Sequence, residues 1–459
     1  MKGAFSKFFS LIAVLTASFP AFAGYSEYGI PDSSEIRKEL VENWFEAPLS
    51  AIRMNHVEIR TSKAGKKFQV RLEETEENFS IIVAPFAKID VDIVSDKGTR
   101  TETQEVYPCD APGAWVLIRD KKSGKAQKIR YYFASDSEIY VQFSPVEKTA
   151  VADFVIYNCY AARGIPTGVP FSYFYSASFD QIVHLTSRSL PWQYSKVSAE
   201  DYEDTMHMVA TIQEKLPKIA FEEDAMYDGE GNPIYITTGK PRKVPDELKD
   251  KATVSGMGFL KLVADGIALP LVGGGLERDP LIEETVKYSE NSFQGIKASE
   301  YGISFALDLI RNLATAISSI RNRHNYKYED STVDVEIEPF TSEWTENGLS
   351  ATYGYIKNSG YSMHTLKSLL YVLAVTEPDT FYFAAIRETD RSVSPELKVF
   401  NECAMIFPFF DNNGHFCVVV FKDGAEIPFD EFYGRYCMDT VCLTKCKSTT
   451  SFILESIAK

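Results

Sequence analysis

The stretch that decides the fold of the C-terminal half is TVSGMGFLKLVADGIALP, residues 253–270. Ser255 is a residue type that caps a helix N-terminus by accepting a backbone hydrogen bond. The apolar residues that follow recur at helical spacing, and Gly266 to Pro270 give the helix an apolar, proline-bounded end. The stretch therefore predicts an amphipathic helix that starts at Gly256.

The segments that follow this helix predict an α+β domain. Residues 299–322 carry an apolar stripe of isoleucine and leucine at helical spacing, and Ser362 is a second candidate helix cap. Runs rich in aromatic and β-branched residues come after these helices, an order typical of an α+β fold. The predicted strands are TFYFAAI (380–386), ECAMIFPFF (402–410), HFCVVVF (415–421) and TSFILES (450–456).

The N-terminal half predicts a different architecture. A first helix is expected over residues 31–47, and from His56 onward the hydrophobic period changes to two. Eight short runs separated by turn residues are typical of an antiparallel β-sandwich or jelly roll. The runs cover residues 56–62, 67–74, 79–86, 88–95, 114–120, 128–134, 138–145 and 153–160.

The chain therefore divides into four predicted parts. Residues 1–23 form a signal peptide, 24–165 the β-sandwich domain with its N-terminal helix, 166–245 a connector, and 246–459 the α+β domain. The connector holds an aromatic loop, a helix near 198–217 and a hairpin turn in YDGEGNPIYI. We expect the loop aromatics to serve packing more than ligand binding. They are Phe171, Tyr173, Phe174 and Tyr175.

The first residues indicate export. Lys2 and Lys7 precede a short apolar run, and Ala21-Phe22-Ala23 is a small-x-small cleavage site. No later run reaches the roughly 18–20 apolar residues of a membrane span, so no transmembrane segment is expected. We expect a protein of the periplasm, the cell envelope or the extracellular space.

Charge and cysteine content restrict the partners. The formal charge of −16 becomes −18 when Lys2 and Lys7 leave with the signal peptide. Nucleic acid and anionic lipid require dense positive charge, so neither is expected as a main partner. Seven cysteines in an exported chain predict disulfides with at least one free thiol. Cys437, Cys442 and Cys446 lack the Cys-x-x-Cys spacing of common zinc sites, and we expect no metal or cofactor.

Two short motifs carry a family resemblance. SGMGFLKLVADGIALP resembles the nucleophile helix of NlpC-type cell-wall cysteine endopeptidases, which opens with Asp-Cys-Ser-Gly-(Phe/Leu) and ends with Gly-Ile-x-Leu-Pro. Ser255 stands in the aspartate position of that motif, and Gly256 stands in the cysteine position. GHFCVVVFKDG (414–424) resembles the histidine strand of the same family, with His415 as its histidine.

The histidine segment is equally similar to a transglutaminase-like pattern. In that pattern an aspartate follows the histidine by fifteen residues, which is Asp430 here. Ser362, in SGYS, falls where a transglutaminase-like Gly-x-Cys would lie. Both families share a papain-like core, so both resemblances imply a papain-like α+β domain.

The resemblance implies a degenerate cleft without its nucleophile. Such a cleft would hold a peptide or a peptidoglycan stem peptide without cutting it, at Ser255, Gly256, Met257, His415 and Asp430. Other interpretations stay open: the serine is a helix cap, and the histidine is a surface residue. An active hydrolase with an unrecognised site and a purely structural or adhesive envelope protein are the alternative functions. The sequence predicts no oligomeric state.

Cleavage after Ala23 gives a first prediction. Intact-mass and N-terminal peptide analysis of the exported protein should find Gly24 as its first residue, because Ala21 and Ala23 fit the signal peptidase site. A retained Met1 or an acylated N-terminus would contradict the prediction of a soluble, exported protein.

Overall fold

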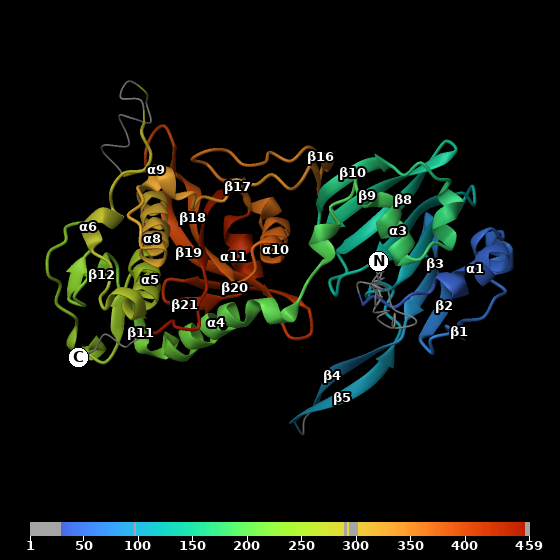
Figure 1. The fold of residues 1–459 in the computed structure, drawn as a ribbon, viewed down its shortest axis with the longest axis horizontal. Helices are drawn as coiled ribbons and strands as arrows, with labels where there is room; N and C mark the ends of the chain where they lie inside the picture. The colour runs from blue at the N-terminus through green and yellow to red at the C-terminus, as the bar shows by residue number, and fades with distance from the viewer. Residues whose placement is uncertain (1–28, 96–97, 289–291, 293–301, 455–459) are drawn as a thin grey trace, which may run out of the picture.

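The computed structural model describes residues 29–95, 98–288, 292 and 302–454. Helices and large antiparallel sheets are both present, so the protein is of the α+β class, as predicted. Figure 1 shows two bodies side by side, with the elements up to α3 (Phe179–Thr186) in one, and α4 (Glu203–Lys215) and most of the later elements in the other. No helix in these residues is both long and apolar enough to cross a membrane. The signal peptide expected at residues 1–23 lies outside the described part.

In the described residues of the first body, ten strands form one antiparallel sheet by their hydrogen bonds. Eight strands follow one another along the sheet, and β15 and β16 from the second half of the chain extend its edge. The order is β1 (Glu58–Thr61), β2 (Lys67–Glu74), β3 (Asn78–Pro85), β6 (Trp115–Asp120), β7 (Ala126–Tyr132), β8 (Ile139–Val146), β9 (Thr149–Ile156), β10 (Cys159–Pro166), β15 (Ser342–Thr345) and β16 (Gly348–Ser350).

A separate hairpin leaves this body. Strands β4 (Ala87–Ser95) and β5 (Gly98–Val106) pair only with each other among the described strands, and the ribbon projects away from the sheet in Figure 1. The prediction of two facing sheets needs correction, because the other described strands from β1 to β10 are hydrogen-bonded neighbours in one sheet. Helical segments, instead of a second sheet, cover the buried face.

Arg37 joins these covering segments to the sheet. It lies in α1 (Ser34–Leu40), is fully buried, and stacks its guanidinium 5.2 Å from the Trp115 ring centroid on β6. Its Nη1 and Nη2 donate to the carbonyl oxygens of Tyr175 and Ala177 at 2.9 and 2.7 Å. Phe174 in the same loop stacks on Phe143 of β8 at 3.8 Å between centroids. The aromatic loop therefore serves packing, as predicted.

Further packing extends past the loop. Phe179 of α3 (Phe179–Thr186) and Trp192 pack against Phe133 and Phe154 on the same face of the sheet. The short elements of this layer are η1 (Val41–Phe45), α2 (Leu49–Ile52), η2 (Phe171–Tyr175) and η3 (Trp192–Ser195).

The second body is a three-layer arrangement around an antiparallel sheet. Helices α5 (Gly256–Val272) and α8 (Phe305–Asn322) pack on one face, and α10 (Leu366–Thr376) and α11 (Phe429–Tyr436) pack on the other. Alternating residues of β18 divide between the two cores, as the period of two requires. The order of described strands is β17 (Tyr361–Ser362), β22 (Thr440–Lys447), β18 (Thr380–Asp390), β19 (Leu397–Phe410), β20 (Phe416–Lys422) and β21 (Ala425–Ile427).

Most predicted elements of this half form. Ser255 caps α5 by accepting the Gly258 N–H at 3.1 Å, and Ser362 accepts the His364 N–H at 3.3 Å. The prediction of a strand at 450–456 is wrong, because residues 450–454 are turn and irregular chain, and the rest lies outside the described residues. The remaining elements are η4 (Ala199–Tyr202), α4 (Glu203–Lys215), η5 (Leu216–Lys218), β11 (Ile219–Phe221), β12 (Ala225–Tyr227), β13 (Pro233–Tyr235), η6 (Asp246–Leu248), β14 (Ala252–Val254), α6 (Arg278–Leu281), α9 (Tyr328–Ser331) and η7 (Met363–Thr365).

The glycines of α5 permit close packing of its backbone. A Cβ at Gly258 would collide with the carbonyl oxygen of Ala225 in β12, which also accepts the Ser255 N–H at 2.8 Å. A Cβ at Gly266 would lie 2.7 Å from the carbonyl oxygen of Ile453. No side chain fits at either contact, which explains why positions 258 and 266 of the stretch 253–270 are glycine.

Substitution of Gly258 should test this packing. Gly258→Ala should lower the free energy of unfolding by about 1–3 kcal/mol, the usual cost of overpacking a core, because a backbone carbonyl cannot move aside. Gly434→Ala in α11 is the control, since its Cβ would meet no atom within 4 Å and alanine is the better helix former. Urea denaturation measures both variants. Equal stability of Gly258→Ala and the parent protein would refute the close-packing explanation.

Candidate functional site

The structure does not bring Gly256 and His415 together. A side chain at Gly256 would point at the Asp423 carboxylate and toward Cys403, whose sulfur lies 3.8 Å from the ideal Cβ. Asp423 follows β20, whereas His415 precedes it. Eight residue steps at about 3.3 Å each separate the two ends by roughly 25 Å. The α5 N-terminus and the histidine therefore face opposite ends of the same strand.

The other residues of the expected cleft are also apart. The His415 side chain is 60% exposed, and its Nδ1 lies 3.3 Å from Asp411 in its own turn. Asp430 is exposed in the first turn of α11. Met257 packs at the edge of the core beside Ser255, which is the helix cap. Ser255, Gly256 and Met257 therefore lie together at the start of α5. His415 and Asp430 both lie elsewhere.

A cleft lies instead at the start of α10, between the two bodies. It has a volume of about 630 Å³, and its floor is the face of the N-terminal sheet turned away from the helical layer. We call it the interdomain cleft. Its lining residues are Lys128, Arg130, Glu138, Tyr140, Gln142, Val155, Tyr157, Asn158, Tyr160, Trp344, Thr345, Glu346, His364 and Tyr433.

Contacts from both bodies fix the walls of this cleft. The Trp344 N–H donates to the Asn158 carbonyl at 2.7 Å, which holds the β15–β16 hairpin beside β10. The Lys367 ammonium of α10 sits 4.1 Å from the centroid of the Tyr157 ring. At the far wall, His364 Nδ1 and the Tyr433 hydroxyl are 2.9 Å apart.

A polar row that crosses three strands begins in the floor of the cleft with Arg130 and Gln142. Arg130, Gln142 and Asp153 are direct cross-strand neighbours on β7, β8 and β9. The Gln142 amide donates from Nε2 to Asp153 Oδ2 at 2.8 Å. Gln142 is only 3% exposed, yet its Oε1 has no hydrogen-bond partner in the described part of the chain. A buried acceptor without a partner is costly, so this oxygen marks a place where a ligand donor would be stabilising.

An adjacent row is aromatic. Tyr132 and Tyr140 lie opposite each other, Tyr140 opposes Val155, and Val155 opposes Tyr160. The Arg130 guanidinium lies 4.6 Å from the Tyr140 ring centroid, a cation–π contact that leaves its Nε unpartnered among the described residues. The floor therefore offers a hydrogen-bond donor, a hydrogen-bond acceptor and aromatic surface within a few ångströms.

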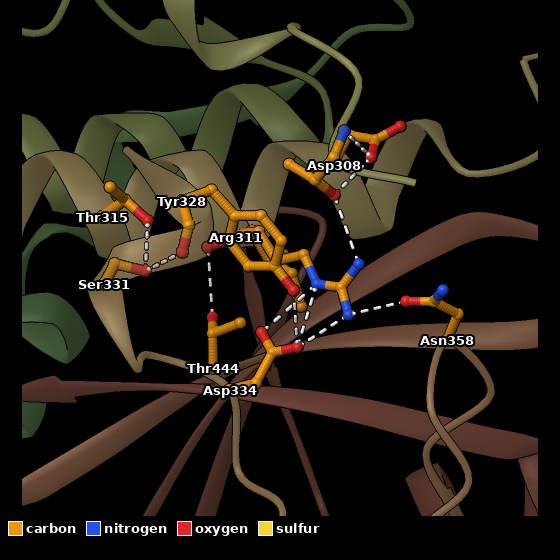
Figure 2. Close-up of polar contacts among 10 residues, drawn as sticks. Asp308, Arg311, Thr315, Tyr328, Ser331, Asp334, Asn358 and Thr444 are labelled. Atoms are coloured by element: carbon orange, nitrogen blue, oxygen red, sulfur yellow. Dashed lines mark hydrogen bonds and ion pairs between the residues drawn. The ribbon is translucent and has the colours of Figure 1, made fainter. Parts of the chain in front are cut away.

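In contrast to the polar row of the cleft, a buried polar network in the second body has a structural role. Arg311 of α8 pairs its Nη2 with Asp334 at 2.7 Å and with the Asn358 side-chain oxygen at 3.0 Å (Figure 2). The Tyr328 hydroxyl donates to the same aspartate at 2.9 Å, and its ring lies 4.7 Å from the guanidinium carbon. Thr285 accepts from Nη1. Every nitrogen of the guanidinium is engaged by the protein, so the network fastens α8 to the segments around residues 334 and 358.

All seven cysteines are free, which corrects the prediction of disulfides. Cys403 and Cys442 pair with Ala385 from opposite sides, which places their Cα atoms about 9–10 Å apart. Cys442 and Cys446 are four residues apart on one strand, or roughly 13 Å. A disulfide requires Cα atoms within about 7 Å, so neither pair can be joined. No three His, Cys, Asp or Glu side chains gather as metal ligands within the described ranges.

Sequence reasoning missed the interdomain cleft. The signal for its floor was present in KIRYYFA, where Lys128 and Arg130 alternate with the core residues Ile129 and Tyr131. That alternation shows which side chains leave the core. It does not show that Trp344 and His364 would close over them from the other body.

The buried thiols should resist alkylation. Burial raises the pKa of Cys159, Cys442 and Cys446 to about 12, so these thiols stay protonated at pH 7.5 and lack nucleophilic thiolate. Iodoacetamide should leave all three unmodified in the native protein and should label them in urea, with peptide mapping as the readout. Partly exposed Cys437 serves as the internal control for reagent activity. Native labelling of the three, or protection from labelling in urea without reductant, would contradict buried free thiols.

Comparisons with known proteins match only part of the chain. Residues 26–194 match a family described as a domain of unknown function (DUF8515). The matched segment begins before α1 and ends within η3, so it spans the first-body sheet up to β10 together with its helical layer. Searches of curated proteins and of solved structures gave no match.

Proposed function

We propose that the protein is a non-catalytic component of the bacterial cell envelope that binds a peptide in the interdomain cleft. The observation that carries the proposal is the buried, unpartnered Oε1 of Gln142 in the cleft floor. A carbonyl oxygen in this position suits an N–H donor, which every peptide group supplies. The volume of about 630 Å³ falls within the usual range for ligand sites, roughly 300–1,000 Å³.

The composition of the walls favours a peptide over a purely apolar ligand. Five aromatic rings line the cleft and can cover apolar side chains, while the polar row supplies partners for backbone groups. Trp344 stands at the rim with its side chain 58% exposed, so ligand binding would bury it. The aromatic lining residues are Tyr140, Tyr157, Tyr160, Trp344 and Tyr433.

The same lining favours binding over cleavage. It contains neither cysteine nor serine, and His364 already shares a hydrogen bond with Tyr433. A covalent mechanism needs a nucleophile within hydrogen-bond reach of its base. Thr345 carries an aliphatic hydroxyl in the lining, but this hydroxyl donates to the Gly348 carbonyl at 3.0 Å. These contacts support a site that retains its ligand unchanged.

The envelope assignment rests on the N-terminal sequence. The signal peptide expected at residues 1–23 would deliver the chain to the compartment that contains peptidoglycan. We therefore propose a wall stem peptide as the ligand class. The papain-like resemblance is compatible with this ligand class, although the site lies at the start of α10 and not at Gly256.

Peptide binding can be measured directly. Isothermal titration with the stem tetrapeptide L-Ala-γ-D-Glu-L-Lys-D-Ala should give saturable binding, and mass spectrometry should recover the peptide intact. Trp344→Ala should weaken binding about tenfold or more, because truncation of an interface aromatic typically costs around 2 kcal/mol. Tyr353→Ala is the matched control, since Tyr353 is 80% exposed and does not line the interdomain cleft. Absence of binding, or equal binding by Trp344→Ala, would reject the proposed function.

A further inference from the structure

Two cations in the floor of the interdomain cleft have no carboxylate within ion-pair distance among the described residues. Lys128 and Arg130 are two residues apart on β7 and leave the sheet on the same face. Neither forms an ion pair in the described part of the chain, although the formal charge of the protein is −16. Burial, and then the positive charge of Arg130, lower the pKa of Lys128, while the Asp153 carboxylate opposes this shift. An anion placed between Lys128 and Arg130 would attract both positive charges and relieve their mutual repulsion.

Three carboxylates lie near the floor, and none forms an ion pair with Lys128 or Arg130 in the described part of the chain; they are Glu138, Glu346 and Asp153. Glu138 lies 3.8 Å from the Lys367 ammonium of α10. Asp153 accepts from Gln142 at 2.8 Å and from the Gly164 N–H at 2.6 Å. A ligand anion can therefore supply the ion pairs that Lys128 and Arg130 lack.

The acceptor beside these cations restricts the shape of that anion. Arg130 and Gln142 are direct cross-strand neighbours, so their Cβ atoms are about 5 Å apart. A ligand that satisfies both must present an anionic oxygen to Arg130 and an N–H to Gln142 Oε1 over a comparable distance. The C-terminal residue of a peptide does so, because its carboxylate and its own amide N–H are attached to one Cα.

We propose that the interdomain cleft binds the carboxyl-terminal end of a peptide, with Lys128 and Arg130 on the terminal carboxylate and Gln142 on the last amide N–H. This inference rests on the proposed function and specifies which part of the peptide occupies the floor. The planar guanidinium suits a carboxylate, and its stacking on Tyr140 holds it in one orientation. The preceding residues of the peptide lie against the aromatic row and Trp344.

A pair of ligands that differ only at the terminus tests the inference. N-acetyl-L-Lys-D-Ala-D-Ala, whose only carboxylate is terminal, and its C-terminal amide would be titrated into the full chain by calorimetry. The parent protein should bind the free acid at least tenfold more tightly than the amide. Arg130→Gln should abolish this preference, while Lys125→Gln, an exposed lysine outside the cleft, should retain it.

The outcomes separate the two proposals. Equal affinity for acid and amide in the parent protein would overturn the terminal-carboxylate inference and leave peptide binding intact. Binding of neither ligand, nor of the stem tetrapeptide, would reject the proposed function itself. Lys128→Gln provides a second variant if Arg130→Gln does not fold by circular dichroism, and it too should reduce the preference for the acid. An unchanged preference in the folded variants would equally overturn the inference.

Discussion

Backbone pairing between β10 and β15 is the interaction on which the arrangement of the two bodies depends. Cys159 opposes Glu343 and Tyr160 opposes Ser342, so a segment from the second half of the chain becomes part of the first-body sheet. Figure 1 shows this segment crossing to the edge strand. The pairing satisfies backbone groups that β10 would otherwise expose and places Trp344 at the rim of the floor. The extended sheet therefore forms both the floor of the interdomain cleft and the part of its rim that carries Trp344.

Two buried arginines hold the layers on either side of this junction. Arg37 fastens the aromatic loop to the first sheet through carbonyl oxygens, and Arg311 fastens α8 to the second sheet through Asp334. Burial of a guanidinium is costly unless its donors are engaged, and in both cases they are. Arg130 differs because its Nε has no partner among the described residues. Arg130 also lines the interdomain cleft, which Arg37 and Arg311 do not.

The sequence predicted the α+β class, most strands and the caps at Ser255 and Ser362, because these follow from local periodicity and side-chain chemistry. It did not predict β10, β22 or the crossing of β15. The β10–β15 pairing joins residues nearly two hundred positions apart, and β22 pairs with β18 more than fifty positions earlier. The candidate site failed for a related reason. Gly256 and His415 belong to adjacent elements, but the direction of β20 places them at opposite ends, and a motif carries no such information. Packing against Ala225 explains Gly258 without any catalytic ancestor.

The free thiols have a consequence for how the chain reaches its folded state. In an oxidising compartment, thiol oxidation and folding compete for the same unfolded molecules, and their relative rates decide the yield. Once Cys442 and Cys446 are enclosed between α8 and the second sheet, their thiols are protected from oxidation. Until then, seven reactive groups can cross-link in non-native pairs. If the chain is exported as proposed, it should thus depend on rapid collapse of its second body, or on a reductant or chaperone, more than on a disulfide-forming catalyst.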